Sequence, residues 1–310
     1  VQGPGIRGLT GPGGLNAMKS VLELDGHRVE PWSPLSTAAV SPPPDTDLLI
    51  LPGPHLHLPA AILAGLESHL TAGGALLLML DPAAELADSS GDAGLAPLLA
   101  ARGLRAGTGF VVDLGEENIK LGKGFEVPVV GRYAPHPVTR RFLERSEPTS
   151  FPLARAFDPI EGTTPMPAGL LLSSDASFEE RGAFDGRAHF DEGVDRKGPF
   201  VLAAASDSSA AGGGPLLVIG DSNFVGEGEI DWFGNDDLLL SAVSWLSRTR
   251  LRPDLALPDA PAQLLPITPG GRRLYALISL LILPALVLSV WPLRLLIRRR
   301  RGRAATRGES

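Results

Sequence analysis

One glycine and four polar residues follow directly after apolar runs that predict β-strands. They are Gly53, Asp81, Asp221, Ser222 and Asn223. Ligands of open α/β sheets bind beyond the carboxyl ends of the strands, so these residues are candidates for lining one ligand-binding crevice. Asp and Ser are also preferred at helix N-termini, and capping of the helices that follow is the alternative explanation.

The tripeptide Gly220-Asp221-Ser222 is similar to the motif that carries the nucleophile in one family of serine esterases. A serine nucleophile is weak without a positioned base. The last histidine of the chain is His189, so none follows Ser222. We therefore predict no catalytic residue, and a hydrolase that uses Ser222 is the alternative.

Three histidines in predicted loops could offer imidazole ligands to a metal. His55 and His57 alternate after a predicted strand, and His136 lies in an Ala-Pro-His-Pro segment. His55 and His57 could share a metal with Asp81, but their spacing matches no zinc signature. We expect exposed loop histidines and no metal site, with a His-bound metal as the alternative.

Gly3, Gly5 and Gly8 formally match the dinucleotide-binding pattern G-x-G-x-x-G, with Glu30 further on. That site needs a strand before the glycines and a helix that opens at them. The helical pattern begins later, near Gly14, so a flexible loop and no cofactor are expected. No glycine loop is followed by Gly-Lys-Ser/Thr, so any ATPase must be a separate subunit.

Apolar runs alternate with helical patterns along the chain. Strands are predicted at 27–31, 48–51, 75–80, 110–112, 199–205 and 215–219, and helices at 14–24, 59–72, 94–101 and 236–247, the last with Asn235 as its N-cap. Continuous apolar strands between amphipathic helices favour a parallel sheet covered on both faces. The predicted fold is therefore α/β, a doubly wound and mostly parallel sheet. The Gly-, Pro- and acid-rich stretch 113–200 is interpreted as an insertion or elaboration of this domain.

The charge of the chain is divided unevenly. The 310 residues carry a net charge of −7, and seven arginines with one acid after residue 273 give that end +6 and leave −13 on residues 1–273. Phosphate contacts need a basic surface, so the body is not expected to bind nucleic acid. The chain has no cysteine. That excludes disulfides, thiol catalysis and thiolate zinc sites.

The end of the chain predicts a membrane anchor. Residues 274–293 are 20 uncharged residues, enough for a helix to span membrane lipid, and we place that helix at 274–297. Because the arginine-rich tail 298–310 follows, the positive-inside rule puts the C-terminus in the cytoplasm and the domain 1–250 outside. The proline-rich stretch 251–273 predicts a semi-rigid spacer. Export needs a signal, so we expect an N-terminal anchor or signal to be missing before Val1.

Several segments combine into a longer pattern. In order, they are Gly26–Pro31, Asp47–Pro54, Gly73–Pro82, Tyr133–Thr139, Val218–Phe224, Gly234–Leu238, Ala242–Leu246 and Ile267–Pro269, followed by the apolar run and the arginine tail. Their order and spacing resemble the auxiliary proteins of ABC transport systems, a family that includes the gliding-motility-associated ABC transporter auxiliary protein.

The resemblance implies a body with the class I glutamine-amidotransferase fold, which is flavodoxin-like. Enzymes of that fold use a cysteine nucleophile, and this chain has none. The resemblance therefore implies a non-enzymatic, substrate-binding-like auxiliary subunit without cofactors, whose partners are an ABC permease and ATPase and whose cargo is unknown. A membrane-tethered hydrolase and a structural envelope protein are the alternatives.

Overall fold

The structure is a computed structural model. It describes residues 8–9, 14–32, 42–43, 45–83, 91–121, 123–164, 166–182, 186–207 and 213–247. The chain divides into two units, Val1–Arg252 and Pro253–Ser310, and the second unit lies outside the described residues. The spacer 251–273, the predicted membrane helix 274–297 and the tail 298–310 lie there too.

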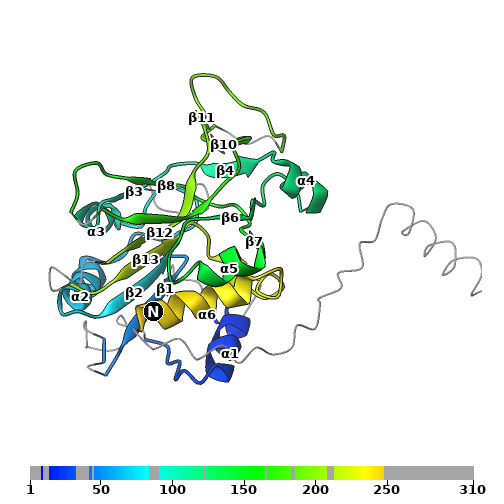
Figure 1. Ribbon diagram of the computed structural model, residues 1–310. Coiled ribbons are helices and arrows are strands. Elements are labelled where there is room, and N and C mark those ends of the chain that lie inside the picture. The colour runs from blue at the N-terminus through cyan, green and yellow to red at the C-terminus, as the bar shows by residue number, and fades with distance from the viewer. Residues whose placement is uncertain are drawn as a thin grey trace, which may run out of the picture. The chain divides into compact units, whose positions relative to one another are not determined.

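An eight-stranded mixed sheet forms the centre of the described domain (Figure 1). Its parallel part has three neighbouring strands: β1 (Leu48–Pro52), β2 (Ala75–Met79) and β13 (Leu216–Ile219), in that order. Nearly all their residues are aliphatic, and β2 and β13 are buried throughout. This is the pattern of strands covered on both faces.

The remainder of this sheet is antiparallel. β12 (Val201–Ser206) pairs antiparallel with β13. Beyond β12 the sheet divides, because two strands pair with β12 and each of them has a further neighbour. The branches are β8 (Phe157–Pro159) with β3 (Leu104–Ala106), and β9 (Ala168–Leu172) with β6 (Arg132–Tyr133).

The prediction of a mostly parallel sheet is therefore wrong, although the α/β class is confirmed. Parallel neighbours need a crossover of a dozen or more residues, usually a helix. Only residues 207–215 separate β12 from β13, so these two strands can pair only as antiparallel neighbours. The other antiparallel strands come largely from the stretch 113–200, which supplies β6, β8 and β9 to the main sheet.

Helices cover both faces of the sheet. Alternate residues of a strand point to opposite faces, so Leu77 of β2 lies in one hydrophobic cluster and Leu78 in the other. The first cluster includes α1 (Asn16–Leu24) and α6 (Asn235–Leu246), which lie side by side in Figure 1. The second includes α2 (Ala60–Thr71) and α3 (Ala96–Ala101).

The middle of the chain also forms structure of its own. The elements are a three-stranded antiparallel sheet of β4 (Phe110–Asp113), β10 (Ser177–Glu180) and β11 (Arg196–Lys197), the pair β5 (Val129–Val130) and β7 (Thr149–Ser150), and the short helices α4 (Glu116–Leu121) and α5 (Arg140–Arg145). In Figure 1 the three-stranded sheet stands at one end of the main sheet.

Two local predictions are wrong. Residues 27–31 form no strand. Asn235 is not the N-cap of α6, because Gly234 holds that position and Asn235 is the first helical residue. Within the described ranges the longest helices have 12 residues, and none is long and apolar enough to cross a bilayer.

Candidate functional site

The predicted crevice residues lie at one edge of the sheet. β1, β2 and β13 are parallel neighbours, so their carboxyl ends bring Gly53, Asp81 and the loop after β13 together. The main-chain N–H of Ser222 donates to Oδ1 of Asp81 at 2.6 Å, and Oγ of Ser222 donates to Oδ2 at 2.8 Å. Ser222 and Asp81 are 0% and 1% exposed. We call this arrangement the Asp81–Ser222 pair.

Gly53 lies directly against the Asp81–Ser222 pair at this edge of the sheet. Its backbone is left-handed, with φ of +48°. A Cβ atom there would lie 2.4 Å from Oγ of Ser222 and 2.6 Å from Oδ2 of Asp81. Only glycine combines that conformation with so close an approach. The glycine thus lets β1 approach the Asp81–Ser222 pair closely.

The side chain of Asp221 forms hydrogen bonds within its own loop. Its two carboxylate oxygens accept hydrogen bonds from the N–H groups of Asn223 (2.7 Å) and Phe224 (3.0 Å), at the start of a short 3-10 helix, Asn223–Val225. The side chain of Asn223 donates to the carbonyl of Pro152 at 3.4 Å. The two contacts of Asp221 are of the kind that the alternative explanation gave, the capping of a following helix, whereas Ser222, at the N-cap position, forms no side-chain capping bond.

Arg155, which was not predicted from the sequence as a site residue, is buried beside the pair. Its Nε donates to the carbonyl of Gly107 at 2.7 Å and its Nη1 to the carbonyl of Asp81 at 3.0 Å. Burial lowers the pKa of Arg155 to about 10, although carboxylates including Glu179 and Asp81 oppose that shift. An arginine within the apolar run Phe151–Phe157 is the signal that could have marked it.

The loop after β13 is also joined to Arg155 through the backbone. The N–H of Arg155 donates to the carbonyl of Gly220 at 2.6 Å. A Cβ on Gly220 would lie 1.9 Å from the carbonyl oxygen of Arg155. Two chain segments therefore cross here at a distance that only glycine permits, and this contact fixes Asp221 and Ser222 in place.

The geometry offers little access for chemistry at Ser222. A nucleophile must reach a substrate and must have a base that takes its proton. The hydroxyl of Ser222 donates instead to a carboxylate, and neither side chain of the Asp81–Ser222 pair is exposed beyond 1%. The two residues instead form buried hydrogen bonds that join the ends of β2 and β13.

The candidate metal-binding histidines have separate surroundings. His57 lies against Gly94, whereas the ring of His136 contacts Trp245 edge-on at 4.9 Å between centroids. Nδ1 of His136 accepts the N–H of Val138 at 3.3 Å, and burial lowers the pKa of this histidine. One group of three potential ligands occurs in the described part of the chain, and it contains no histidine: Glu180, Asp191 and Asp195.

That acidic group has a structural explanation. Oδ1 of Asp195 accepts the N–H of Arg181 at 3.0 Å, and Oδ2 accepts the N–H of Asp191 at 2.7 Å. Oε1 of Glu180 accepts the N–H of Gly182 at 2.9 Å. The carboxylates therefore organise the loop between β10 and β11.

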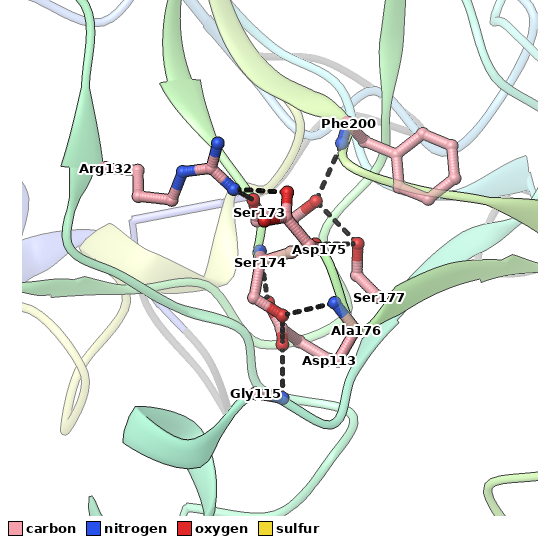
Figure 2. A network of polar contacts seen from close by, with 9 residues as sticks. All are labelled: Asp113, Gly115, Arg132, Ser173, Ser174, Asp175, Ala176, Ser177 and Phe200. Carbon is pink, nitrogen blue, oxygen red and sulfur yellow. Dashed lines mark hydrogen bonds and ion pairs between the residues drawn. The ribbon is translucent and has the colours of Figure 1, made fainter.

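A second polar network, shown in Figure 2, joins β4 to the loop after β9. Oδ2 of Asp113 accepts the N–H of Ser174 at 2.9 Å, and Oδ1 accepts the N–H of Gly115 at 2.8 Å. Oγ of Ser173 accepts the N–H of Phe200 at 2.7 Å. Arg132 forms an ion pair with Asp175 at 2.7 Å. The network ties the three-stranded sheet to the main sheet.

The dinucleotide pattern receives no support from its surroundings. Gly3 and Gly5 lie outside the described residues, and Gly8 lies inside them. Helix α1 begins at Asn16, eight residues after Gly8, rather than at the glycines as that cofactor site requires.

Comparisons with known proteins identify the family. No curated protein matches the chain. A similar solved structure is described as the mmIFT52 N-terminal domain, with 17% sequence identity and a TM-score of 0.48 over 67% of this chain and 80% of that chain. Residues 9–242 match the family model described as an ABC-type uncharacterized transport system. The match covers most of the chain, which therefore belongs to this family of auxiliary components of an ABC-type transport system.

Proposed function

We propose that this chain is a non-enzymatic, membrane-anchored auxiliary subunit of an ABC-type transporter, and that its domain binds cargo or partner proteins. The observation that carries the proposal is the burial of the Asp81–Ser222 pair, in which both polar side chains are held by each other. Groups arranged in this way stabilise a scaffold and are not presented to a substrate. The family match supplies the transport context.

The division of labour follows from the sequence. No glycine loop is followed by the Lys-Ser/Thr that holds nucleotide phosphates, so ATP hydrolysis belongs to a separate ATPase. The apolar run 274–293 would anchor the chain beside a multi-span permease. We assign the acidic body, with its charge of −13, to the outside of the membrane and the arginine tail to the cytoplasm.

Co-purification tests the proposal. The full chain, tagged at its C-terminus and extracted in mild detergent, should carry an ABC ATPase and a permease through two affinity steps. A matched sample lacking residues 274–310 should lose both proteins if the association depends on the anchor. Purification of the full chain without either protein would refute the proposal.

The orientation has a separate test. A reporter enzyme fused after Ser310 should show activity typical of the cytoplasm, and the same reporter fused at Ser247 should behave as exported. The opposite pattern would overturn the topology and leave the transporter assignment to the co-purification result.

A further inference from the structure

A depression of about 400 Å³ lies between α4 and α5, which stand on the same side of the domain in Figure 1. Tyr133 of β6 and Phe142 of α5 are buried and form its floor. Leu121 of α4 and Leu143 of α5 line it as exposed side chains, 43% and 45% accessible. We call it the α4–α5 depression, and its other lining residues are Glu117, Gly131, Ser146 and Pro148. All of them come from one stretch of the chain, of which every residue but one glycine is described.

Helix α4 is held in place by a polar side chain. Asn118 is the buried residue of this helix, and its Nδ2 donates to the carbonyls of Asp113 (2.9 Å) and Gly124 (2.8 Å). Its Oδ1 accepts the N–H of Val129 at 3.0 Å. A surface helix usually buries an apolar face instead. The anchoring of α4 through Asn118 leaves Leu121 exposed at the depression.

One carboxylate faces the depression. Glu117 is the only charged residue among the described residues that line it. A Cβ atom on Gly131 would lie 3.0 Å from Oε2 of Glu117, so this carboxylate lies over the backbone of Gly131. The adjacent Glu116 forms an ion pair with Lys120 at 3.0 Å, whereas Glu117 forms none with any residue that the structure describes. The depression therefore combines an apolar floor with a carboxylate that has no paired cation.

The electrostatic potential at the floor is negative. The hydroxyl of Tyr133 donates to the carbonyl of Val130 at 2.7 Å, inside the domain. Burial is the main reason that the pKa of this hydroxyl is raised, and the carboxylates of Glu147 and Glu117 add to the shift. Two negative charges thus act on the side chain that forms the floor, which favours a positively charged occupant.

We propose that the α4–α5 depression binds an arginine side chain of a partner protein. The guanidinium pairs with Glu117, and the aliphatic stem lies between Leu121 and Leu143. A guanidinium pairs with a carboxylate through two parallel hydrogen bonds, and an arginine stem packs well on apolar surface. A wholly apolar occupant would remove Glu117 from water without giving it a partner, which is unfavourable. This inference rests on the proposed function, because it names a surface through which the domain binds a partner.

Two other occupants of the depression are outcomes of the test. A membrane surface fits the charge less well, because it would bring Glu117 against acyl chains and anionic headgroups. A second copy of this chain offers two exposed arginines on α5, Arg140 and Arg145. The chain belongs to a family of auxiliary transport components, so we take another protein as the partner.

A peptide selection provides the probe. The full chain in mild detergent is the bait, and short random peptides displayed on phage are the candidates. The enriched peptides should carry arginine. Replacing that arginine by citrulline, its neutral isostere, in a synthetic copy of the peptide should weaken binding about tenfold, because the ion pair is lost.

Variants of α4 assign the contact to Glu117. Glu117→Gln should weaken binding of the arginine peptide about tenfold and leave binding of the citrulline peptide unchanged, because that peptide already lacks the ion pair. Leu121→Ala should weaken binding of both peptides, because both stems pack on Leu121. Ile119→Ala is the matched control: Ile119 is an exposed apolar residue of the same helix that does not line the depression, so binding should not change.

Four outcomes would overturn the proposal. Two of them are enriched peptides without arginine, and equal binding of the arginine peptide by wild type and Glu117→Gln. Self-association of the full chain that Glu117→Gln abolishes would assign the depression to a second copy. Because the chain has no cysteine, a fluorophore on Leu121→Cys reports on this site alone. A blue shift of its emission in phosphatidylglycerol vesicles without peptide would assign the depression to the membrane.

The association with transport subunits is measured separately. If the ATPase and the permease co-purify with the wild-type chain while the peptide experiments fail, the arginine site is refuted and the proposed function stands. If the peptide experiments succeed while neither subunit co-purifies, the proposed function is refuted and the depression remains an arginine site for a different partner.

Discussion

The carboxylate of Asp81 accepts two hydrogen bonds from one residue, Ser222, through the main-chain N–H at 2.6 Å and through Oγ at 2.8 Å. Asp81 lies two residues after the end of β2 and Ser222 lies three residues after the end of β13, so this bidentate contact joins the carboxyl ends of two neighbouring parallel strands. Open α/β sheets bind ligands at this edge, whereas the polar side chains of Asp81 and Ser222 form hydrogen bonds with each other here.

Removing the Asp81 carboxylate should destabilise the domain strongly. Asp81→Ala leaves a buried N–H and a buried hydroxyl without their acceptor, and each unsatisfied group costs about 1–3 kcal/mol. Ser222→Ala should cost less, because the N–H of residue 222 still donates to Asp81. Urea denaturation gives the free energy of unfolding for both variants.

A double-mutant cycle tests whether the two residues act together. Ser222→Ala made in the Asp81→Ala background should have little further effect, with a coupling of about 1–2 kcal/mol. Asp175→Ala is the matched control, because this aspartate is exposed and forms a surface ion pair with Arg132, so its loss should change stability little. Strict additivity at Asp81 and Ser222 would contradict the assignment.

Gly53→Ala should destabilise the domain more than Gly73→Ala. Both glycines are left-handed, with φ of +48° and +89°, and alanine there costs about 1–2 kcal/mol for the backbone conformation alone. A Cβ at Gly53 would also lie 2.4 Å from Oγ of Ser222, whereas a Cβ at Gly73 meets nothing within 4 Å. Thermal unfolding of the two variants separates the cost of the backbone conformation from the cost of the close contact. Equal losses of stability in the two variants would rule out the close contact.

The sequence predicted the three parallel strands and their flanking helices because their signals are local. Apolar runs of four or more residues, bounded by glycine or proline, mark β1, β2 and β13. It also placed Gly53, Asp81 and Ser222 at one edge, because the carboxyl ends of parallel neighbours always meet.

The antiparallel half could not be predicted in the same way. β6 has two residues, and β3 and β8 have three each, too few for any periodicity. Their pairing depends on contacts between residues far apart in the chain, such as Tyr133 with Leu171. Arg155 was missed for a similar reason, because its partners are carbonyl groups, which carry no signature in the sequence.

Asp237 should make the stability of the domain depend on pH. Burial raises its pKa from 3.8 to about 6, although the nearby Arg141 opposes the shift. Because the folded-state pKa exceeds the unfolded value, the folded state binds the proton more tightly, and the free energy of unfolding should fall as pH rises from about 4 to 6. Asp237→Asn should remove that fall, which amounts to about 2 kcal/mol. Urea titrations at several pH values measure it.

The control for this prediction is the neighbouring Asp236→Asn variant. It changes the formal charge of the first turn of α6 equally and lies on the same helix. Its pH profile should keep the fall that Asp237→Asn removes. Parallel profiles for wild type and Asp237→Asn between pH 4 and 6 would refute the raised pKa.

Variants of Asn235 distinguish two roles of this residue. One is the N-cap of a helix, and the other is a buried side chain whose hydrogen bonds to Ser150 and Glu229 we call the clamp. Its Oδ1 accepts the N–H of Ser150 at 2.9 Å, and its Nδ2 donates to the carbonyls of Glu229 (3.0 Å) and Ser150 (3.2 Å). At an N-cap, Asp replaces Asn with little loss of stability. In the clamp, Asn235→Asp replaces the donor by an oxygen that faces the carbonyls of Ser150, Phe224 and Glu229, and the variant should lose about 2–4 kcal/mol of unfolding free energy.

Asn235→Ser serves as the matched variant, because serine is also a preferred N-cap residue but cannot span the three partners of the clamp. Both variants should therefore unfold at lower urea concentrations than wild type. The loss should be greater for Asp, whose added negative charge would be buried where Asn235 has no exposed surface. Wild-type stability in both variants would restore the capping role that the sequence predicted, and would mean that α6 is held to β7 by its apolar contacts rather than by Asn235.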